Sequence, residues 1–430
     1  MNFQDRLQKV IPGGAHTYSR GADQFPVGAP QILARGKGAY VFDDKGKRYL
    51  DYGMALRAVN IGYAEDEIDD AAIQQIRNGN NLTRPSLIEL EAAELFTELI
   101  DSVDMVKFTK NGSTSVSAAV KLARAYTGRE LIARCAEHPF FSYDDWFIGS
   151  TPLTRGVPGS SVDQTKLFRF NHIESLRALF DQYSGQIACV VLEPATNAHP
   201  DKDFLQQVQA LCRTEGAVMI LDEMITGFRW HLQGAQHYYG LQPDLCTFGK
   251  AMANGFSVSC VAGRREIMEL GSIEFPGRER VFLLSTTHGA EMCGMGAFVA
   301  TIKYLKREPV IDHLWSYGQR LIDLINGVAA EFGVQASLSA GGVPCSPHYQ
   351  TLDVHGKPSL PLRTLFSQEM IRNGVLMPWI ALSYRHGDEE LALTERALRE
   401  ALMVYRLAFE SGAERFLEGP AIKPVFRTHN

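Results

Sequence analysis

Continuous apolar strands separated by helical segments are the feature that most constrains the fold of this chain. QIACVVLEP (186–194) and AVMILDE (217–223) are typical of buried strands, and DFLQQVQALCRTEG between them is typical of a helix that ends at Gly216. Two more buried strands are predicted in LCTFGK and VSCVAG. Strands without polar alternation are covered on both faces, so we predict an α/β fold with a mostly parallel sheet and helices on both faces.

The N-terminal half adds local signals of the same kind. Residues 40–52 (YVFDDKGKRYLDY) predict a hairpin that turns at Asp44-Lys45-Gly46. MVKFT (105–109) is a short strand, followed by Asn111-Gly112-Ser113 and by a helix that closes at Gly128. A strand, a small polar turn and a helix therefore follow one another directly.

The pattern changes after about residue 320. A helical segment, GQRLIDLINGVAAEFG, is followed by a Gly/Ser/Pro-rich stretch (337–347) and by a long amphipathic helix, DEELALTERALREALMVYRLAFESG. Because chain ends often lie close together, we expect the first segment, 1–50, to pack with a small α/β domain, 321–430. Residues 51–320 then form the large domain.

Composition excludes several classes of function. The formal net charge is −6 and the basic residues are scattered, which disfavours nucleic-acid binding. The N-terminus lacks the apolar core of a signal peptide, and no apolar run approaches the ~18 residues that cross a bilayer. The cysteines number seven and form no CxxC pair, so we expect a reduced, cytoplasmic protein without a metal site and without membrane or nucleic-acid partners.

Three polar residues, Glu193, Asp222 and Lys250, end predicted strands. Ligands of such sheets bind beyond the carboxyl ends of the strands. An aldehyde cofactor such as pyridoxal phosphate requires an amine, an acid opposite its pyridine nitrogen, a phosphate cup and a flat partner for its ring. The chain offers a candidate for each of these.

Lys250 is the candidate amine and Asp222 the candidate acid. Asn111, Gly112 and Ser113 stand at a helix start, where free N–H groups bind phosphate, and Phe140 is the candidate ring partner. Each residue also has an ordinary structural explanation. A lysine stem can lie on apolar surface, a carboxylate can form a local ion pair or cap, Ser113 can cap its helix, and Phe140 can belong to the core.

LDEMITGFRW…PDLCTFGKAMANGFSVSCVAG resembles the core motif of class III aminotransferases, which are fold-type I pyridoxal-phosphate enzymes. IPGGAHTYSR, ARGKGAYVFDDKGKRYLDYG, KNGSTSVSAAVKLARAYTGRE and TTHGAEMCGMGAFVAT also resemble family segments and occur in the family's order. The resemblance covers roughly residues 10 to 400 and is greatest to the glutamate-1-semialdehyde aminomutase branch. GAHTYSRGADQFP and DDWFIGSTPLTRGVP are similar to branch members of surface-sugar and secondary-metabolite pathways.

The resemblance implies a role for each motif residue. Lys250 would hold the cofactor as a Schiff base, Asp222 would pair with the pyridine nitrogen, and Glu193 would line the site. The cofactor's phosphate would be held by Gly112 and Ser113, and by Thr287 (in STTHGAE) from the neighbouring subunit of a homodimer with shared active sites.

For the substrate, the resemblance implies that Arg20 holds a carboxylate and that Arg57 is a second anion binder. Either arginine could instead form a structural ion pair. The family pattern NSGTEA reads NGSTSV here and loses its glutamate, and YHG reads FFS. Phe140 would then stack on the ring in place of the usual tyrosine, although the longer spacing leaves Phe141 open as an alternative.

The implied activity is transfer of an amino group from an amino-acid donor, with L-glutamate as the family's usual donor, to a carbonyl acceptor such as a keto sugar. An aminomutase that moves the amine within one substrate is the first alternative. Racemisation or decarboxylation on the same scaffold, or a non-catalytic binding protein, are further alternatives.

Overall fold

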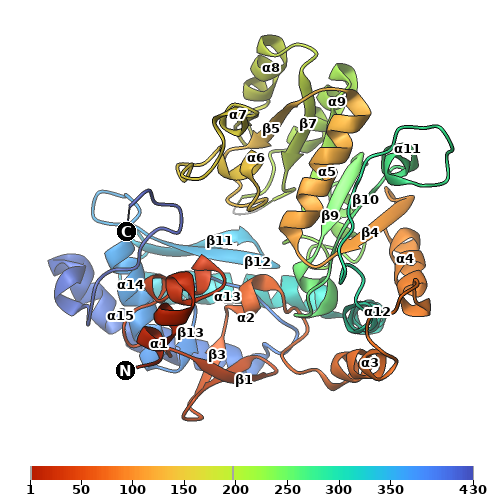
Figure 1. Cartoon of the computed structure of the whole chain (residues 1–430). Helices are drawn as coiled ribbons and strands as arrows, with labels where there is room; N and C mark the ends of the chain where they lie inside the picture. Colours follow the sequence, from red (N-terminus) through yellow and green to blue (C-terminus); the bar gives the residue numbers. More distant parts are fainter. Residues whose placement is uncertain (1, 196–197, 430) are drawn as a thin grey trace. The chain divides into compact units, whose positions relative to one another are not determined.

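The computed structural model describes residues 2–195 and 198–429, which form two compact units. One unit, named here the unit of the chain ends, combines an N-terminal segment, residues 2–65, with a C-terminal segment, residues 312–427, drawn in red and blue in Figure 1. The other contains residues 66–311, drawn from orange to teal. These divisions, at 65/66 and 311/312, differ from the predicted boundaries at 50/51 and 320/321.

The middle unit is built on a seven-stranded sheet in the order β4-β10-β9-β8-β7-β5-β6. The pairs from β6 to β9 are parallel, whereas β10 is antiparallel to both β9 and β4. The sheet is mostly parallel, in agreement with the prediction. Its strands are β4 (Met105–Thr109), β5 (Leu131–Cys135), β6 (Thr165–Phe168), β7 (Ile187–Leu192), β8 (Val218–Glu223), β9 (Leu245–Phe248) and β10 (Ser259–Gly263).

Helices cover this sheet. Met219 and Leu221 of β8 pack in one apolar cluster with Leu205 and Val208 of α9, so the alternate residues, including Asp222, face the opposite side. The helix α5 packs on β7 to β10. The helices are α3 (Asp66–Arg77), α4 (Leu87–Leu99), α5 (Gly112–Thr127), α6 (Asp145–Ile148), α7 (Gly159–Val162), α8 (Ile173–Gln182), α9 (Phe204–Glu215), α10 (Gly234–Tyr238), α11 (Arg265–Met268) and α12 (Met292–Arg307).

The unit of the two chain ends contains a four-stranded sheet, β1-β2-β3-β13, and a separate hairpin, β11–β12. Only β13 pairs in parallel, with β3. Its elements are α1 (Phe3–Val10), β1 (Leu33–Lys37), β2 (Tyr40–Asp43), β3 (Arg48–Asp51), α2 (Met54–Arg57), most of α13 (Val310–Glu331), β11 (Leu338–Val343), β12 (Ser346–Thr351), α14 (Leu360–Arg372), β13 (Val375–Leu376) and α15 (Asp388–Ser411).

The predicted hairpin at 40–52 is confirmed as β2 and β3. The side chain of Asp43 accepts hydrogen bonds from the N–H groups of Lys45 (3.0 Å) and Lys47 (2.8 Å), and Gly46 has the positive φ of +81° that this turn needs. The Gly/Ser/Pro-rich stretch 337–347, in contrast, holds most of a second antiparallel hairpin, β11–β12. No helix of the described residues is long and apolar enough to cross a membrane.

Candidate active site

Asp222 lies at the end of β8 and is only 2% exposed. Its Oδ1 accepts hydrogen bonds from the N–H of Met224 (2.9 Å) and from the hydroxyl of Thr247 (3.1 Å), its register partner on β9. Burial raises the pKa of Asp222 to about 6, while these donors and the charge of Lys250 act to lower it. The buried carboxylate is therefore suited to a cationic partner.

Lys250 follows β9 as the first residue of a 3₁₀ turn, η4 (Lys250–Ala253). It is half-buried, whereas the next three residues are buried, and its φ of +46° lies in the left-handed region. A non-glycine residue persists in this region only where the surrounding structure enforces it, often at a functional site. The ammonium of Lys250 acts on the pKa of Asp222, so the two charges lie in one electrostatic environment.

Gly249 and Gly112 allow two backbone segments to approach Met224, which lies directly after Asp222 and Glu223. A Cβ on Gly249 would lie 2.6 Å from the sulfur of Met224 and 2.5 Å from the hydroxyl of Ser259. A Cβ on Gly112 would lie 2.9 Å from the same sulfur. Met224, which was not among the predicted site residues, therefore packs against the segments that carry the lysine, the aspartate and the helix start.

The N-terminus of α5 is capped by Asn111, whose Oδ1 accepts hydrogen bonds from the N–H (2.9 Å) and the hydroxyl (3.0 Å) of Thr114. The first N–H groups of a helix have no partner within it, so those of Gly112 and Ser113 are the ones suited to an anion. The hydroxyl of Ser113 accepts a hydrogen bond from the N–H of Tyr143 (3.2 Å). Asn111 therefore shapes the helix start through its cap.

The two candidate ring partners differ in burial. Phe141 is 2% exposed, and its ring meets the edge of Phe147, with centroids 5.9 Å apart. Phe140 is 48% exposed and meets Phe147 with centroids 5.6 Å apart. Phe141 belongs to the core, and Phe140 has ring surface left for a ligand.

Glu193 is buried directly after β7, and its N–H donates a hydrogen bond of 3.0 Å to Nδ1 of His138. Burial lowers the pKa of His138 to about 3, so the ring is neutral and carries its proton on Nε2. His138 was not predicted as a site residue. No sequence signal indicates a hydrogen bond between His138 and Glu193, because the two residues are 55 positions apart.

Thr287 lies in an exposed turn before α12, and its carbonyl accepts a hydrogen bond of 3.0 Å from the side chain of Asn81. The neighbouring Thr286 is also exposed. After this turn, Glu291 forms a 2.6 Å ion pair with Lys110, the residue before Asn111. The Thr287 turn is thus tied to the loop that leads into α5.

The two predicted substrate arginines belong to the unit of the chain ends, whereas the other predicted site residues belong to the middle unit. Arg20 ends a 3₁₀ turn, η2 (Tyr18–Arg20), and is exposed. Arg57 ends α2, which is a left-handed turn, since the φ values of Met54, Ala55, Leu56 and Arg57 run from +38° to +67°.

Asp51 holds the start of this left-handed turn. Its carboxylate accepts hydrogen bonds from the N–H groups of Gly53 (2.7 Å) and Met54 (3.1 Å) and from the hydroxyl of Tyr63 (2.7 Å). Left-handed backbone costs roughly 1–2 kcal/mol per non-glycine residue, so four such residues in succession mark a conformation that the surroundings impose.

Comparisons with known proteins identify the family of the chain. The sequence profile of the family described as "Aminotransferase class-III" matches residues 18–343. The chain is 31% identical to a 3-aminobutyryl-CoA aminotransferase of Cloacimonas acidaminovorans (94% of this chain, 96% of the relative). It is also 31% identical to a glutamate-1-semialdehyde 2,1-aminomutase of Francisella philomiragia (91% and 95%). A solved structure of Sphingopyxis FumI, described as a PLP internal aldimine form, matches with a TM-score of 0.87 and 26% identity over 95% of this chain and 97% of that one.

The residues of the middle unit fit pyridoxal phosphate, which the description of the FumI structure names. Asp222 is a buried carboxylate suited to a protonated ring nitrogen. Lys250 supplies an amine whose charge acts on the pKa of Asp222. The start of α5 presents N–H groups at Gly112, where a Cβ would crowd Met224. The fold is that of fold-type I enzymes. The chain belongs to the class-III aminotransferase family, and its cofactor is pyridoxal phosphate.

Proposed function

We propose that this protein transfers an amino group from an amino-acid donor, with L-glutamate as the first candidate, to a carbonyl acceptor. The observation that carries the proposal is Lys250, held in left-handed backbone within the electrostatic reach of buried Asp222. Family membership supports an enzyme of the aminotransferase or aminomutase type. The roles given below to Lys250, Asp222 and the other site residues are proposed in the same way.

Bound pyridoxal phosphate supplies an electron sink for the carbanion formed at the donor carbon. The amine of Lys250 would hold the cofactor and, as a general base, would accept a proton from the donor carbon. Asp222 would favour a protonated ring nitrogen, because a buried carboxylate is stabilised by a neighbouring cation. Loss of Lys250 should therefore cost several orders of magnitude in rate.

The remaining predicted residues would bind and orient. Gly112 and Ser113 would donate N–H groups to the phosphate, and the exposed ring of Phe140 would cover the cofactor ring. Glu193 would line the site. Thr287 of a second copy would contact the phosphate in a homodimer with shared active sites. Thr286 is the neighbouring residue and also carries a hydroxyl, so Thr286→Val and Thr287→Val are to be tested as separate variants.

Arg20 would bind the donor's carboxylate and Arg57 a second anionic group, since a guanidinium matches a carboxylate with two parallel hydrogen bonds. Acceptors to be tested are keto sugars, nucleotide-linked keto sugars, small keto acids and 3-oxoacyl thioesters. The last class follows from the name of the 3-aminobutyryl-CoA aminotransferase relative. We propose a cytoplasmic location.

The test is a single half-reaction. The purified protein, loaded with pyridoxal phosphate, is mixed with L-glutamate while its visible absorbance and the released 2-oxoglutarate are measured. Bleaching with one 2-oxoglutarate per site supports amino transfer from glutamate. Visible absorbance that persists with every donor excludes the proposal, and a protein that binds no cofactor would favour a non-catalytic scaffold.

An aminomutase is the second candidate, because the relatives include glutamate-1-semialdehyde 2,1-aminomutases at 31% identity. A mutase needs no external donor and releases no keto acid. Turnover of glutamate-1-semialdehyde by the loaded protein alone, without 2-oxoglutarate, would replace the transferase proposal by this one.

A further inference from the structure

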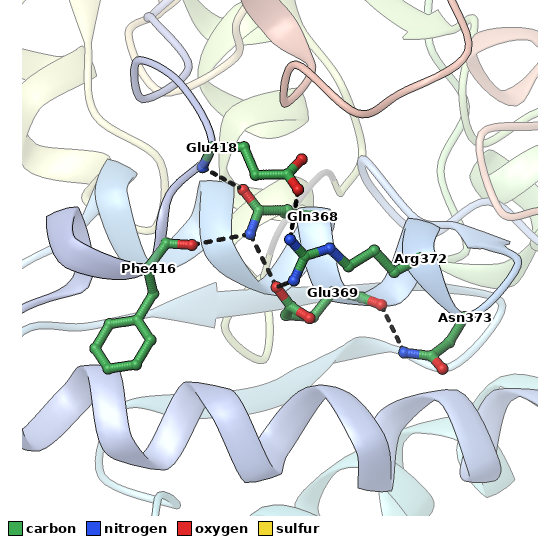
Figure 2. Close-up of polar contacts among 6 residues, drawn as sticks. All are labelled: Gln368, Glu369, Arg372, Asn373, Phe416 and Glu418. Carbon is green, nitrogen blue, oxygen red and sulfur yellow. Dashed lines mark hydrogen bonds and ion pairs between the residues drawn. The ribbon is translucent and has the colours of Figure 1, made fainter.

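Residues 412–427 follow α15 and are named here the strap. Phe416 and Glu418 of the strap lie beside α14 (Figure 2). The side chain of Gln368 on α14 bonds the strap twice. It donates a hydrogen bond to the carbonyl of Phe416 and accepts one from the N–H of Glu418, both at 3.0 Å. Gln368 is only 3% exposed, so its hydrogen-bonding groups are committed to these partners and to Glu369.

Arg372 adds a charged link at the same place. Its guanidinium bonds Glu369 of α14 at 2.6 Å and Glu418 of the strap at 2.5 Å (Figure 2). Further along, the N–H of Ile422 donates a hydrogen bond of 3.0 Å to the hydroxyl of Thr364, again on α14. The first part of the strap is therefore fixed along α14.

The second part of the strap bonds the N-terminal segment. The N–H of Lys423 donates to the carbonyl of Asp23 (3.0 Å), and the side chain of Gln24 donates to the carbonyl of Lys423 (2.9 Å). Arg427 and Asp23 form an ion pair of 2.6 Å. A Cβ on Gly419 would overlap Cγ2 of Val27, so the strap lies in direct contact with this segment.

Two of the residues that bond the strap, Asp23 and Gln24, follow Arg20 by three and four positions. The 3₁₀ turn η2 (Tyr18–Arg20) is followed after Gly21 by another, η3 (Ala22–Gln24), which carries Asp23 and Gln24. Neither turn buries a residue of its own, and the nearest apolar anchor is Phe25, which packs beside Val41 and Tyr49. In the described part of the chain, the guanidinium of Arg20 forms no hydrogen bond or ion pair, although its charge acts to lower the pKa of Tyr63, and the N–H of Arg20 donates to the carbonyl of Thr17 (2.9 Å). The position of the guanidinium therefore depends mainly on the backbone that bears it.

We propose that the strap is a positioning device for Arg20. Asp23, Gly419 and Arg427 act through the backbone of η2 and η3 and fix where the guanidinium meets the donor's carboxylate. Fixing a binding group beforehand strengthens binding, because less freedom is lost when the ligand arrives. The inference rests on the proposed function in one respect, the role of Arg20 as the carboxylate binder.

The test compares two glycine-to-alanine changes in the same unit. Gly419→Ala places a methyl group against Val27 and displaces the strap, whereas Gly327→Ala on α13 meets nothing within 4 Å and is the matched control. Arg427→Gln, which removes the ion pair with little change in shape, is the second variant. All are studied as the loaded, full-length protein.

Two readouts that do not depend on turnover are measured. The first is amide hydrogen exchange of residues 17–28. The second is the calorimetric affinity for glutarate, which has both carboxylates of L-glutamate and no amine. We expect faster exchange and a Kd raised about three- to tenfold in Gly419→Ala, with a smaller change of the same sign in Arg427→Gln. The control should match the parent protein.

An unchanged glutarate Kd in Gly419→Ala, with or without faster exchange, would overturn the proposal, as would a parent protein that does not bind glutarate. Failure of the proposed function is seen separately, as a parent protein that binds glutarate but does not release 2-oxoglutarate from L-glutamate. In that case the dependence of glutarate binding on the strap still decides this inference.

Discussion

The hydroxyl of Thr247 on β9 donates a hydrogen bond of 3.1 Å to Oδ1 of Asp222 on β8, and the two residues are direct register partners. Three positions separate Thr247 from Lys250, so one short segment supplies both the amine and a support for the acid. The hydrogen bond stabilises the ionised form of Asp222 and acts to lower its pKa.

Thr247→Val should therefore weaken amino transfer without removing the cofactor. A hydrogen bond to a charged group contributes about 1.5–3 kcal/mol, so its loss raises the pKa of Asp222 by about one unit or more. The rate of the half-reaction with L-glutamate should fall about tenfold, and further at pH 6 than at pH 8, because more of the carboxyl is protonated in acid. Thr247→Ser, which keeps the hydroxyl, is the control. Equal rates for the parent, Thr247→Val and Thr247→Ser proteins would show that the Thr247 hydroxyl does not support Asp222 in the reaction.

Asp222→Asn should make the cofactor-free protein more stable at neutral pH. Burial raises the pKa of Asp222 from 3.8 to about 6, a difference of 2.2 units. Ionisation in the folded state is thus opposed, and stability falls as pH rises from about 4 to 6 and stays lower above it. At about 1.4 kcal/mol per unit, the variant gains up to about 3 kcal/mol at pH 8 and nothing at pH 3.5. Urea unfolding at both pH values measures the gain, and a variant less stable at pH 8 would contradict it.

Gly112→Ala should weaken binding of pyridoxal phosphate, since the new methyl group would lie 2.9 Å from the sulfur of Met224. The three heavy atoms nearest to this methyl group all belong to that one flexible side chain. Met224→Ala in the same protein should therefore restore most of the lost affinity, measured by titration with the cofactor.

Gly249→Ala is the contrasting variant, because its methyl group would also lie 2.5 Å from the hydroxyl of Ser259. Met224→Ala alone should not rescue it. Equal rescue of Gly112→Ala and Gly249→Ala by Met224→Ala would contradict the role of Ser259 in limiting the space at Gly249.

His138→Phe should destabilise the protein, because it leaves the buried N–H of Glu193 without its acceptor. An unsatisfied buried donor costs about 1–3 kcal/mol, measurable by urea unfolding at pH 7. His138→Asn keeps an acceptor near the position of Nδ1 and should lose less. Burial lowers the pKa of His138 from 6.5 to about 3, so at pH 6 the unfolded chain binds a proton that the folded protein excludes. The stability advantage of the parent over His138→Phe should therefore be smaller at pH 6 than at pH 8, by about 0.8 kcal/mol. A difference that stays the same from pH 8 to pH 6 would mean that burial does not lower the pKa of this ring.

The sequence predicts the elements whose signals are local. Gly128 ends α5 as expected, at a φ of +68°, because this cap depends on a glycine alone. The other end differs from the expectation, since Asn111 is the N-cap and Ser113 lies inside the helix. The hairpin β11–β12 was missed because its first strand contains Gly341 and Gly342, which break the apolar alternation that indicates a strand.

Long-range packing explains what could not be predicted around the site. Met224 is an ordinary apolar residue in the sequence and becomes notable only where Gly112 and Gly249 approach it. The left-handed turn at Met54–Arg57 is enforced by Asp51 and by the indole of Trp379, which donates a hydrogen bond of 3.0 Å to the carbonyl of Gly53 from 326 positions away. No local propensity favours such a turn.

The most direct test of the central claim is to find which lysine holds the cofactor. The protein is loaded with pyridoxal phosphate, reduced with borohydride, digested and mapped by mass spectrometry, with Lys250→Ala treated in parallel. We expect a phosphopyridoxyl group on the peptide that contains Lys250 and no stoichiometric label in the variant. A stoichiometric label on another lysine, or an unlabelled Lys250 in the loaded protein, would contradict it.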